Sequence, residues 1–144
     1  MTGVQTCALP ISSATITTRY LDSFVYQPLS INVISPGTFT SIQDYPGRQN
    51  HWDVGIPPSG PFDNVSFRLG NSLLGNDQNC AGLELTLSGP TLQFNSATSI
   101  VIAGADIDAR LNDEAIALWQ VIKIEAGDKL ALGKVTAEIG RAHV

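Results

Sequence analysis

The chain has 144 residues, with 8 Lys and Arg against 13 Asp and Glu, and a formal net charge of −5. Its few basic residues are scattered, which argues against a nucleic-acid-binding surface, and no apolar run is long enough to cross a bilayer. Outside a terminal segment discussed next, Cys80 is the one cysteine, so neither a disulfide framework nor a cysteine zinc site is expected. The reducing cytoplasm is the simplest location.

The two ends of the chain are related through their codons. Back-translation of residues 138–144 gives DNA whose reverse complement, read one base out of frame, encodes residues 6–11 and a following serine. Protein termini have no physical reason to be reverse complements, and the DNA resembles sequencing-adapter read-through. A signal peptide would need a basic start and a longer apolar run. We therefore predict that residues 1–11 and 139–144 are adapter-derived scars that pack poorly.

Residues 12–30 are polar and rich in threonine, which predicts a linker from a preceding domain. From Ile31 onward the pattern indicates strands, with alternation at Ile31 and Val33 and a turn at residues 35–37. Further strands are predicted where short apolar or alternating runs lie between turn residues: 38–42, 83–87, 91–94, 99–103, 107–111, 119–124 and 129–132. Several short strands with such turns are typical of an all-β barrel or sandwich.

One helix is predicted, over residues 64–74. Asp63 is a candidate N-cap, and Gly75 suits the left-handed position after the helix. The expected apolar face consists of Val65, Leu69 and Leu73, with Phe62 beside it. Asp63 has two interpretations, a structural cap or a catalytic carboxylate. We favour the cap, although the start of the helix could also bind an anion.

Residues 41–63 read SIQDYPGRQNHWDVGIPPSGPFD and concentrate proline, glycine and reactive side chains. Proline and glycine hold a loop in one shape without regular backbone pairing. Polar residues on a stiff loop are a common layout of a functional site, and an ordinary surface loop is the alternative. The pattern alone does not decide between them.

Individual residues of this loop also have two interpretations each. Asp44 and Arg48 could form an ion pair that shapes the loop, or could position a substrate, since arginine offers a planar fork to a carboxylate. His51 could be a general base or could cap a turn. Ser59 lies between Pro58 and Gly60, where a ligand can approach the backbone closely. No basic partner is fixed near Ser59, so a covalent serine mechanism has little support.

Polar residues outside the loop fit structural roles better. Asn71 lies on the predicted helix and is more typical of a packing or solvated residue than of a ligand contact. Glu84 is expected to be a partnered structural carboxylate, and Cys80 a packed small side chain. The acidic pairs at 106/108 and 113/114 are interpreted as solvated turns, because no histidine or cysteine accompanies them, so no metal site is predicted.

Three ordered motifs together resemble a known family: SPGTFTSIQDYPGR at 35–48, GIPPSGPFD at 55–63 and LGNSLLGN at 69–76. They are similar to the carboxyltransferase domain of biotin-dependent urea carboxylase. The wider family includes allophanate hydrolase subunit 2 and a 5-oxoprolinase subunit. The resemblance runs from about residue 24 to 132. It implies that residues 31–138 are the N-terminal part of such a domain, with a mainly β fold: an incomplete cyclophilin-like β-barrel with one short helix.

The resemblance implies a parent enzyme that transfers a carboxyl group from carboxybiotin to urea and forms allophanate. Biotin is expected on a separate carrier domain of the same parent, and ATP is expected in a separate biotin carboxylase domain; the fragment alone should be inactive. We expect Asp44, Arg48 and His51 to be catalytic. The residues expected to bind substrate or carboxybiotin are Gln43, Pro58, Ser59, Gly60 and Asn71.

Two other classes of function stay open at this point. One is an amide-hydrolysing subunit of the 5-oxoprolinase or allophanate hydrolase subunit 2 type, which needs no biotin. The other is a non-catalytic regulatory binding module, which would show an interaction surface and no turnover.

Overall fold

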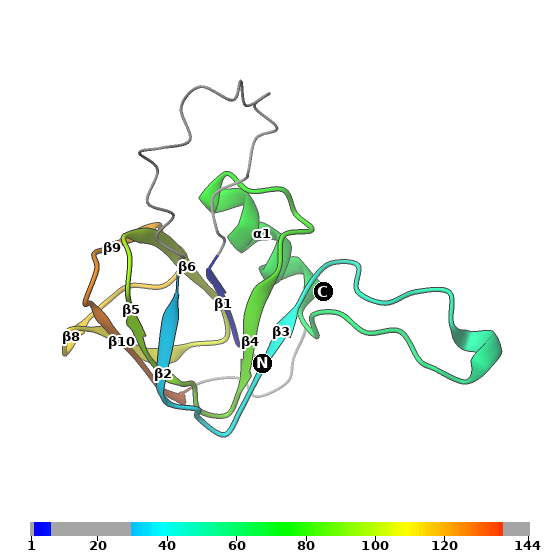
Figure 1. The fold of residues 1–144 in the computed structure, drawn as a ribbon, viewed down its shortest axis with the longest axis horizontal. Helices are drawn as coiled ribbons and strands as arrows, with labels where there is room; N and C mark the ends of the chain where they lie inside the picture. The colour runs from blue at the N-terminus through cyan, green and yellow to red at the C-terminus, as the bar shows by residue number, and fades with distance from the viewer. Residues whose placement is uncertain (1, 7–29, 137–144) are drawn as a thin grey trace, which may run out of the picture.

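The computed structural model describes residues 2–6 and 30–136, which form two antiparallel sheets and one α-helix (Figure 1). Sheet 1 has the strand order β3-β4-β1-β6-β9, and sheet 2 has the order β2-β5-β10-β7-β8. The predicted mainly β fold with one short helix is confirmed, and the two sheets are not closed into a barrel. Within the described part of the chain, no helix has the length and apolarity needed to span a membrane.

The strands are short, as the spacing of turn residues predicts. Sheet 1 consists of β1 (Thr2–Thr6), β3 (Phe39–Gln43), β4 (Gly82–Thr86), β6 (Thr98–Gly104) and β9 (Ile122–Ile124). Sheet 2 consists of β2 (Ile31–Ser35), β5 (Thr91–Phe94), β7 (Ile107–Leu111), β8 (Glu114–Ala115) and β10 (Lys129–Val135). The strand predicted over 119–124 starts too early, because Trp119 has φ 61°, a left-handed conformation that breaks strand pairing.

The core lies between the two sheets. Alternation along β5 buries Leu92 and Phe94, while β10 contributes Leu130 and Leu132 from the same sheet. The facing side chains of sheet 1 include Leu85, Ile100, Ile102 and Ile124. Burying a side chain of this size stabilises the fold by about 1.5–3 kcal/mol relative to leaving it exposed.

The α-helix α1 (Asn64–Leu74) begins and ends where the sequence predicts. The Asp63 carboxylate accepts the Ser66 backbone N–H at 3.0 Å, so the cap interpretation is confirmed. Gly75 has φ 75°, and its N–H donates to the Ser72 carbonyl at 3.0 Å. Gly75 therefore ends the helix as a left-handed C-terminal residue.

The predicted buried face of α1 is wrong. Val65, Leu69 and Leu73 are about half exposed, and the buried residues are instead Phe67, Gly70 and Asn71. The helix lies against β6 and β1 with this second face (Figure 1). Both the predicted face and the observed face have residues at helical spacing, so the sequence pattern alone does not choose between them. Gly70 lets the helix backbone approach the sheet more closely than a larger side chain would.

The cap gives a first testable prediction. In a complete carboxyltransferase-type domain, Asp63→Ala should lower the free energy of unfolding by about 1 kcal/mol, because the Ser66 N–H loses its acceptor. Asp63→Asn should retain most of the stability, since an amide oxygen also caps helices. Denaturant unfolding of the three proteins measures both differences. Equal stability of Asp63→Ala and wild type would show that the Asp63 cap does not stabilise the domain.

The strand β1 comes from the segment that the sequence analysis interprets as a scar. It pairs antiparallel with β4 and with β6, from Thr2 opposite Leu85 and Gly104. Leu9 and Ile11 lie outside the described residues, as do residues 12–29 and the predicted C-terminal scar. Sheet pairing uses backbone N–H and C=O groups of any sequence, so it does not reveal the origin of a strand. The expectation of poor packing does not hold for the backbone of residues 2–6, because β1 is paired on both sides within sheet 1. The adapter origin stays a prediction, which a genomic read across both termini tests.

The free edges of the sheets give a second prediction. Within the described residues, β3 pairs only with β4, and β2 pairs only with β5. Phe39 on β3 and Val33 on β2 are 60% and 62% exposed. Unpaired edges with apolar side chains favour association, so we expect the isolated chain to be poorly soluble or molten. A sharp, concentration-independent thermal melt of a monomer would contradict this expectation.

Candidate functional site

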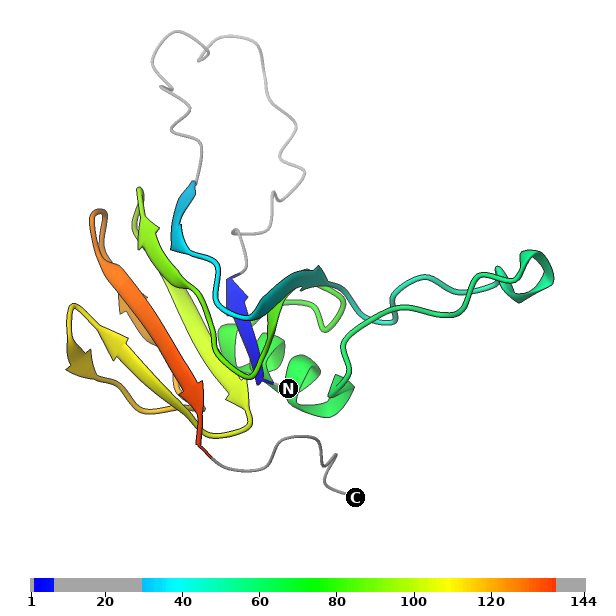
Figure 2. The same cartoon turned by 90° about the horizontal axis from the view of Figure 1, so that it is seen from below.

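Residues 44–62, here called the arm, join β3 to α1 and project far from the two sheets (Figure 1 and Figure 2). The short 3₁₀ helix η1 (Trp52–Val54) lies at the far end of the arm. The arm thus contains most of the predicted site residues. Hydrogen bonds within the arm connect its two limbs.

The two limbs of the arm are joined through Arg48 and Ser59. The Arg48 backbone N–H donates to the Ser59 hydroxyl at 2.8 Å, and the Ser59 N–H donates to the Arg48 carbonyl at 3.2 Å. One guanidinium nitrogen of Arg48 also donates to the Pro57 carbonyl at 3.3 Å. The structure therefore brings together Arg48, Ser59 and the adjacent Pro57 and Pro58. The Ser59 hydroxyl helps to hold the two limbs together, because it accepts the Arg48 N–H.

Gly47 allows the limbs to come this close. Its φ is +75°, and a Cβ atom built on it would lie 2.2 Å from the Ser59 carbonyl oxygen. On the opposite limb, a Cβ on Gly60 would lie 3.0 Å from the Pro46 oxygen and 3.4 Å from the Asp44 oxygen. Gly60 therefore lies against the backbone of the first limb, so the contact between the limbs extends to the base of the arm.

His51 lies at the far end of the arm, next to η1. Its carbonyl accepts the Val54 N–H at 3.3 Å and the Ile56 N–H at 3.0 Å, and its Nδ1 contacts the Gln49 carbonyl. These contacts correspond to the turn-capping alternative. Because Asp44 directly follows β3 at the other end of the limb, the arm keeps the two residues apart, and a catalytic role for His51 stays a prediction.

Asp44 has an exposed carboxylate at the base of the arm. No hydrogen bond or ion pair joins this carboxylate to another residue in the described ranges, and the ion pair with Arg48 that the spacing permits is not formed there. Its neighbour Gln43 ends β3 and donates from Nε2 to the Ser41 hydroxyl at 3.0 Å. Asp44 is thus available as an acceptor for an external N–H donor.

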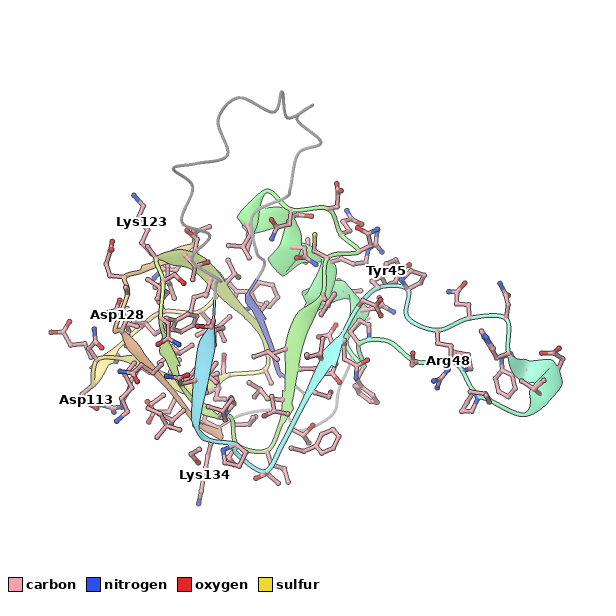
Figure 3. All side chains as sticks on the ribbon, in the orientation of Figure 1. Tyr45, Arg48, Asp113, Lys123, Asp128 and Lys134 are labelled. Atoms are coloured by element: carbon pink, nitrogen blue, oxygen red, sulfur yellow. The ribbon has the colours of Figure 1, made fainter. Side chains whose placement is uncertain are left out.

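Arg68 connects the base of the arm to α1, a contact that the sequence analysis missed. Its guanidinium carbon lies 4.9 Å from the centre of the Tyr45 ring, and its Nε donates to Gln78 Oε1 at 2.7 Å. Figure 3 shows Tyr45 where the arm leaves the body and Arg48 farther out along it. Neither contact partner lies at helical or strand spacing from Arg68, so no periodic signal marks it.

Asn71, the one predicted binding residue outside the arm and β3, is fully buried. Its Nδ2 donates to the Cys80 carbonyl at 2.9 Å and to the Gln78 carbonyl at 3.4 Å. Its Oδ1 has no hydrogen-bond partner among the described residues. Asn71 therefore holds the 78–80 loop that also contacts Arg68, while a role in binding stays a prediction.

Glu84 on β4 is the partnered structural carboxylate that the sequence predicts. Its Oε2 accepts the Phe62 backbone N–H at 2.7 Å, where the arm meets the start of α1. Ser41 lies directly opposite on β3, so Glu84 fixes the returning limb beside the first. Burial raises the pKa of Glu84 above 4.5, although the hydrogen bond from Phe62 acts in the other direction.

This pKa shift predicts a pH-dependent stability. A carboxyl whose pKa is raised by folding contributes stability below its unfolded pKa and loses it as pH rises through the folded value. Glu84→Gln stays neutral and keeps an oxygen to accept the Phe62 N–H. In a complete domain, the variant should match wild type below about pH 4 and become the more stable protein as pH rises above 4.5. Denaturant unfolding in these two pH ranges measures the difference in stability between Glu84→Gln and wild type. A difference that does not change with pH would contradict the prediction.

The described residues do not include a group of side chains that could bind a metal ion. Over residues 2–6 and 30–136, no three His, Cys, Asp or Glu side chains are grouped so that they could hold a metal ion. The Asp108 carboxylate instead pairs with Arg110 at 3.3 Å, with both side chains about half exposed.

Comparison with known families identifies the family to which the chain belongs. Residues 54–142 match the family model for the carboxyltransferase domain, subdomain A and B. The chain belongs to the carboxyltransferase domain family. The match includes the limb of the arm that returns from η1 to α1, the helix α1 itself and the strands from β4 to β10.

Individual proteins and a solved structure are also similar to this chain. The chain is 44% identical over 124 residues to urea amidolyase of Lachancea kluyveri, covering 86% of this chain and 7% of that protein. It is 34% identical over 102 residues to a 5-oxoprolinase subunit of Escherichia coli K12, covering 71% of this chain and 33% of that protein. The crystal structure of Kluyveromyces lactis urea carboxylase superposes with a TM-score of 0.74 at 47% identity, over 84% of this chain and 11% of that one.

The chain therefore spans a small part of the relatives that it matches. This carboxyltransferase sequence covers 7% of the urea amidolyase and 33% of the 5-oxoprolinase subunit. It is a fragment of a carboxyltransferase domain.

Proposed function

We propose that the parent of this chain is a urea carboxylase, and that the arm contributes to transfer of a carboxyl group to urea. Support comes from the higher identity to urea amidolyase, 44%, than to the 5-oxoprolinase subunit, 34%. The single structural observation that carries the proposal is the arm, with the unpaired Asp44 carboxylate at its base and Arg48 fixed on its limb.

In this proposal, biotin on a carrier domain of the same parent supplies the carboxyl group, and a separate biotin carboxylase domain uses ATP. The arm fits an exchange of this kind because it offers both an acceptor and a donor. In this step, the Asp44 carboxylate would accept an N–H of urea and take its proton as the urea nitrogen bonds to the carboxyl carbon. That carbon would separate from the biotin ring nitrogen, to which Asp44 would pass the proton. The guanidinium of Arg48 gives one nitrogen to Pro57 and retains further N–H groups for a carboxyl group.

The proposal leaves two tasks to residues of the parent that this fragment lacks. Transfer needs a dry pocket and additional N–H donors around the reacting oxygens. Asp44 and Arg48 are both exposed here. We therefore propose that the isolated fragment is inactive. We also propose that the parent works in the cytoplasm.

The substrate of the complete parent tests the proposal. Purified parent should form ADP from ATP and bicarbonate at a rate that rises severalfold with urea, and avidin should block this rise. Formation of ADP that depends on 5-oxoproline, insensitive to avidin, would replace the proposal with the 5-oxoprolinase type. Binding of another protein without turnover of either compound would favour the regulatory module.

A further inference from the structure

Arg68 on α1 has no anionic partner in the part of the chain that the structure describes. The contacts of its side chain there are with neutral groups: Nε donates to Gln78 Oε1 at 2.7 Å, and the guanidinium carbon lies 4.9 Å from the centre of the Tyr45 ring. The ion pair that the described residues form joins Arg110 to Asp108. Arginine is not deprotonated in proteins, so Arg68 keeps a full positive charge beside neutral groups.

The contacts of Arg68 orient the guanidinium and leave one edge of it free. An arginine side chain has five N–H donors, and the bond to Gln78 uses only the one on Nε. The Nη1 and Nη2 groups have no hydrogen-bond acceptor among the described residues. Together they form a planar edge whose parallel N–H bonds match the two oxygens of a carboxylate.

The elements that hold Arg68 are themselves held in place. Gln78 lies in a loop that Asn71 fixes, because the buried Asn71 amide donates to the carbonyls of Gln78 and Cys80. Arg68 is half-buried and follows Phe67, which packs under the helix at 3% exposure. A side chain on a helix that is supported by further hydrogen bonds keeps its orientation better than one on a free loop.

Tyr45 places the guanidinium of Arg68 at the base of the arm. The Tyr45 ring lies under the guanidinium, and Asp44 directly precedes Tyr45 in the chain. Figure 3 shows Tyr45 where the arm leaves the body and Arg48 farther out. Although both residues are described, the Asp44 carboxylate forms no ion pair with Arg68. A hydrogen-bond acceptor and a planar donor are therefore both available at this end of the arm.

We propose that Arg68 binds the carboxyl group that is to be transferred, end-on through Nη1 and Nη2. A carboxyl group on a ureido nitrogen is a planar anion with two oxygens, and the free edge of Arg68 fits this shape. Arg68 thus adds a second planar donor to that of Arg48, closer to the base of the arm where Asp44 accepts a proton. This role rests on the proposed function and assigns a residue outside the arm to the site.

A soluble carboxyl donor tests this role in the complete parent enzyme. The carrier domain is left without biotin, ATP is omitted, and N-carboxybiotinamide supplies the carboxyl group to urea. Biotinamide, which lacks that carboxyl group, serves as the inhibitor. In Arg68→Gln, the KM for N-carboxybiotinamide should rise roughly ten- to a hundredfold, because a charge-assisted hydrogen-bonded pair is lost. The inhibition constant of biotinamide should stay unchanged, since biotinamide has no carboxylate for Arg68 to bind.

Two further variants complete the experiment. Arg110→Gln, the matched control, should retain the wild-type KM. Arg68→Lys keeps the charge without the planar edge, so it should raise the KM less than Arg68→Gln does. An unchanged KM in both Arg68 variants, or an equal rise of the KM and the inhibition constant, would overturn the role of Arg68 and leave the proposed function intact. Absence of transfer to urea by the wild-type parent would contradict the proposed function, and this role with it.

Discussion

Replacing Asp44 by Asn, or Arg48 by Ala, in the complete parent enzyme should lower urea-dependent carboxylation by about 10²–10⁴-fold. Asp44 offers an unpaired carboxylate at the base of the arm, and the amide that replaces it would lack the basicity to take a proton. Arg48→Ala removes the guanidinium that Pro57 orients. Steady-state turnover with saturating urea measures both losses.

Two controls separate catalysis from folding in this experiment. Bicarbonate-dependent ATP cleavage by the separate carboxylase domain should survive in both variants. Arg110→Ala is the matched arginine control, since Arg110 forms an exposed ion pair with Asp108, worth no more than about 1 kcal/mol. Near-normal turnover of Asp44→Asn and Arg48→Ala would remove both residues from the mechanism. Equal loss of both half-reactions would indicate misfolding.

Gly47→Ala should disable the arm, while Gly55→Ala should be tolerated. Both glycines lie in the arm with nearly equal φ, 75° and 76°, so an alanine has a similar backbone cost of roughly 1–2 kcal/mol at either position. They differ in surroundings. A Cβ on Gly47 meets the Ser59 carbonyl at 2.2 Å, whereas nothing lies within 4 Å of a Cβ on Gly55.

The difference between these variants isolates the contact between the limbs. Pushing the limbs apart by about 1 Å misplaces the groups of the arm, which commonly costs about 10²-fold in rate. We expect that loss for Gly47→Ala in urea-dependent turnover, with Gly55→Ala close to wild type. Equal activity of the two variants would show that the contact between the limbs does not matter for the reaction.

Local signals in the sequence predicted much of the fold. Asp63 and Gly75 mark the ends of α1, because capping depends on residues within one helical turn. Turn residues and alternation likewise located most strands. The left-handed Trp119 was missed, since nothing local distinguishes it from a strand residue.

Contacts between distant residues escaped prediction. Which face of α1 is buried depends on the sheet that it meets, and Gly70 and Asn71 rather than Val65 and Leu69 meet it. The stacking of Arg68 on Tyr45 joins residues with no periodic relationship. The candidate residues of the arm were predictable by type and family, but their separation along it, with His51 beside η1, follows from the fold.

Transfer of a labelled carboxyl group, measured in a single turnover, tests the central claim most directly. The complete carboxyltransferase domain is mixed with a separately carboxylated biotin carrier domain, without ATP, bicarbonate or the carboxylase domain. We predict that label moves to urea as allophanate with the wild-type domain, and that Asp44→Asn slows this step by about 10²-fold or more. Transfer to urea at an unchanged rate in Asp44→Asn, or no transfer to urea by the intact domain, would contradict it.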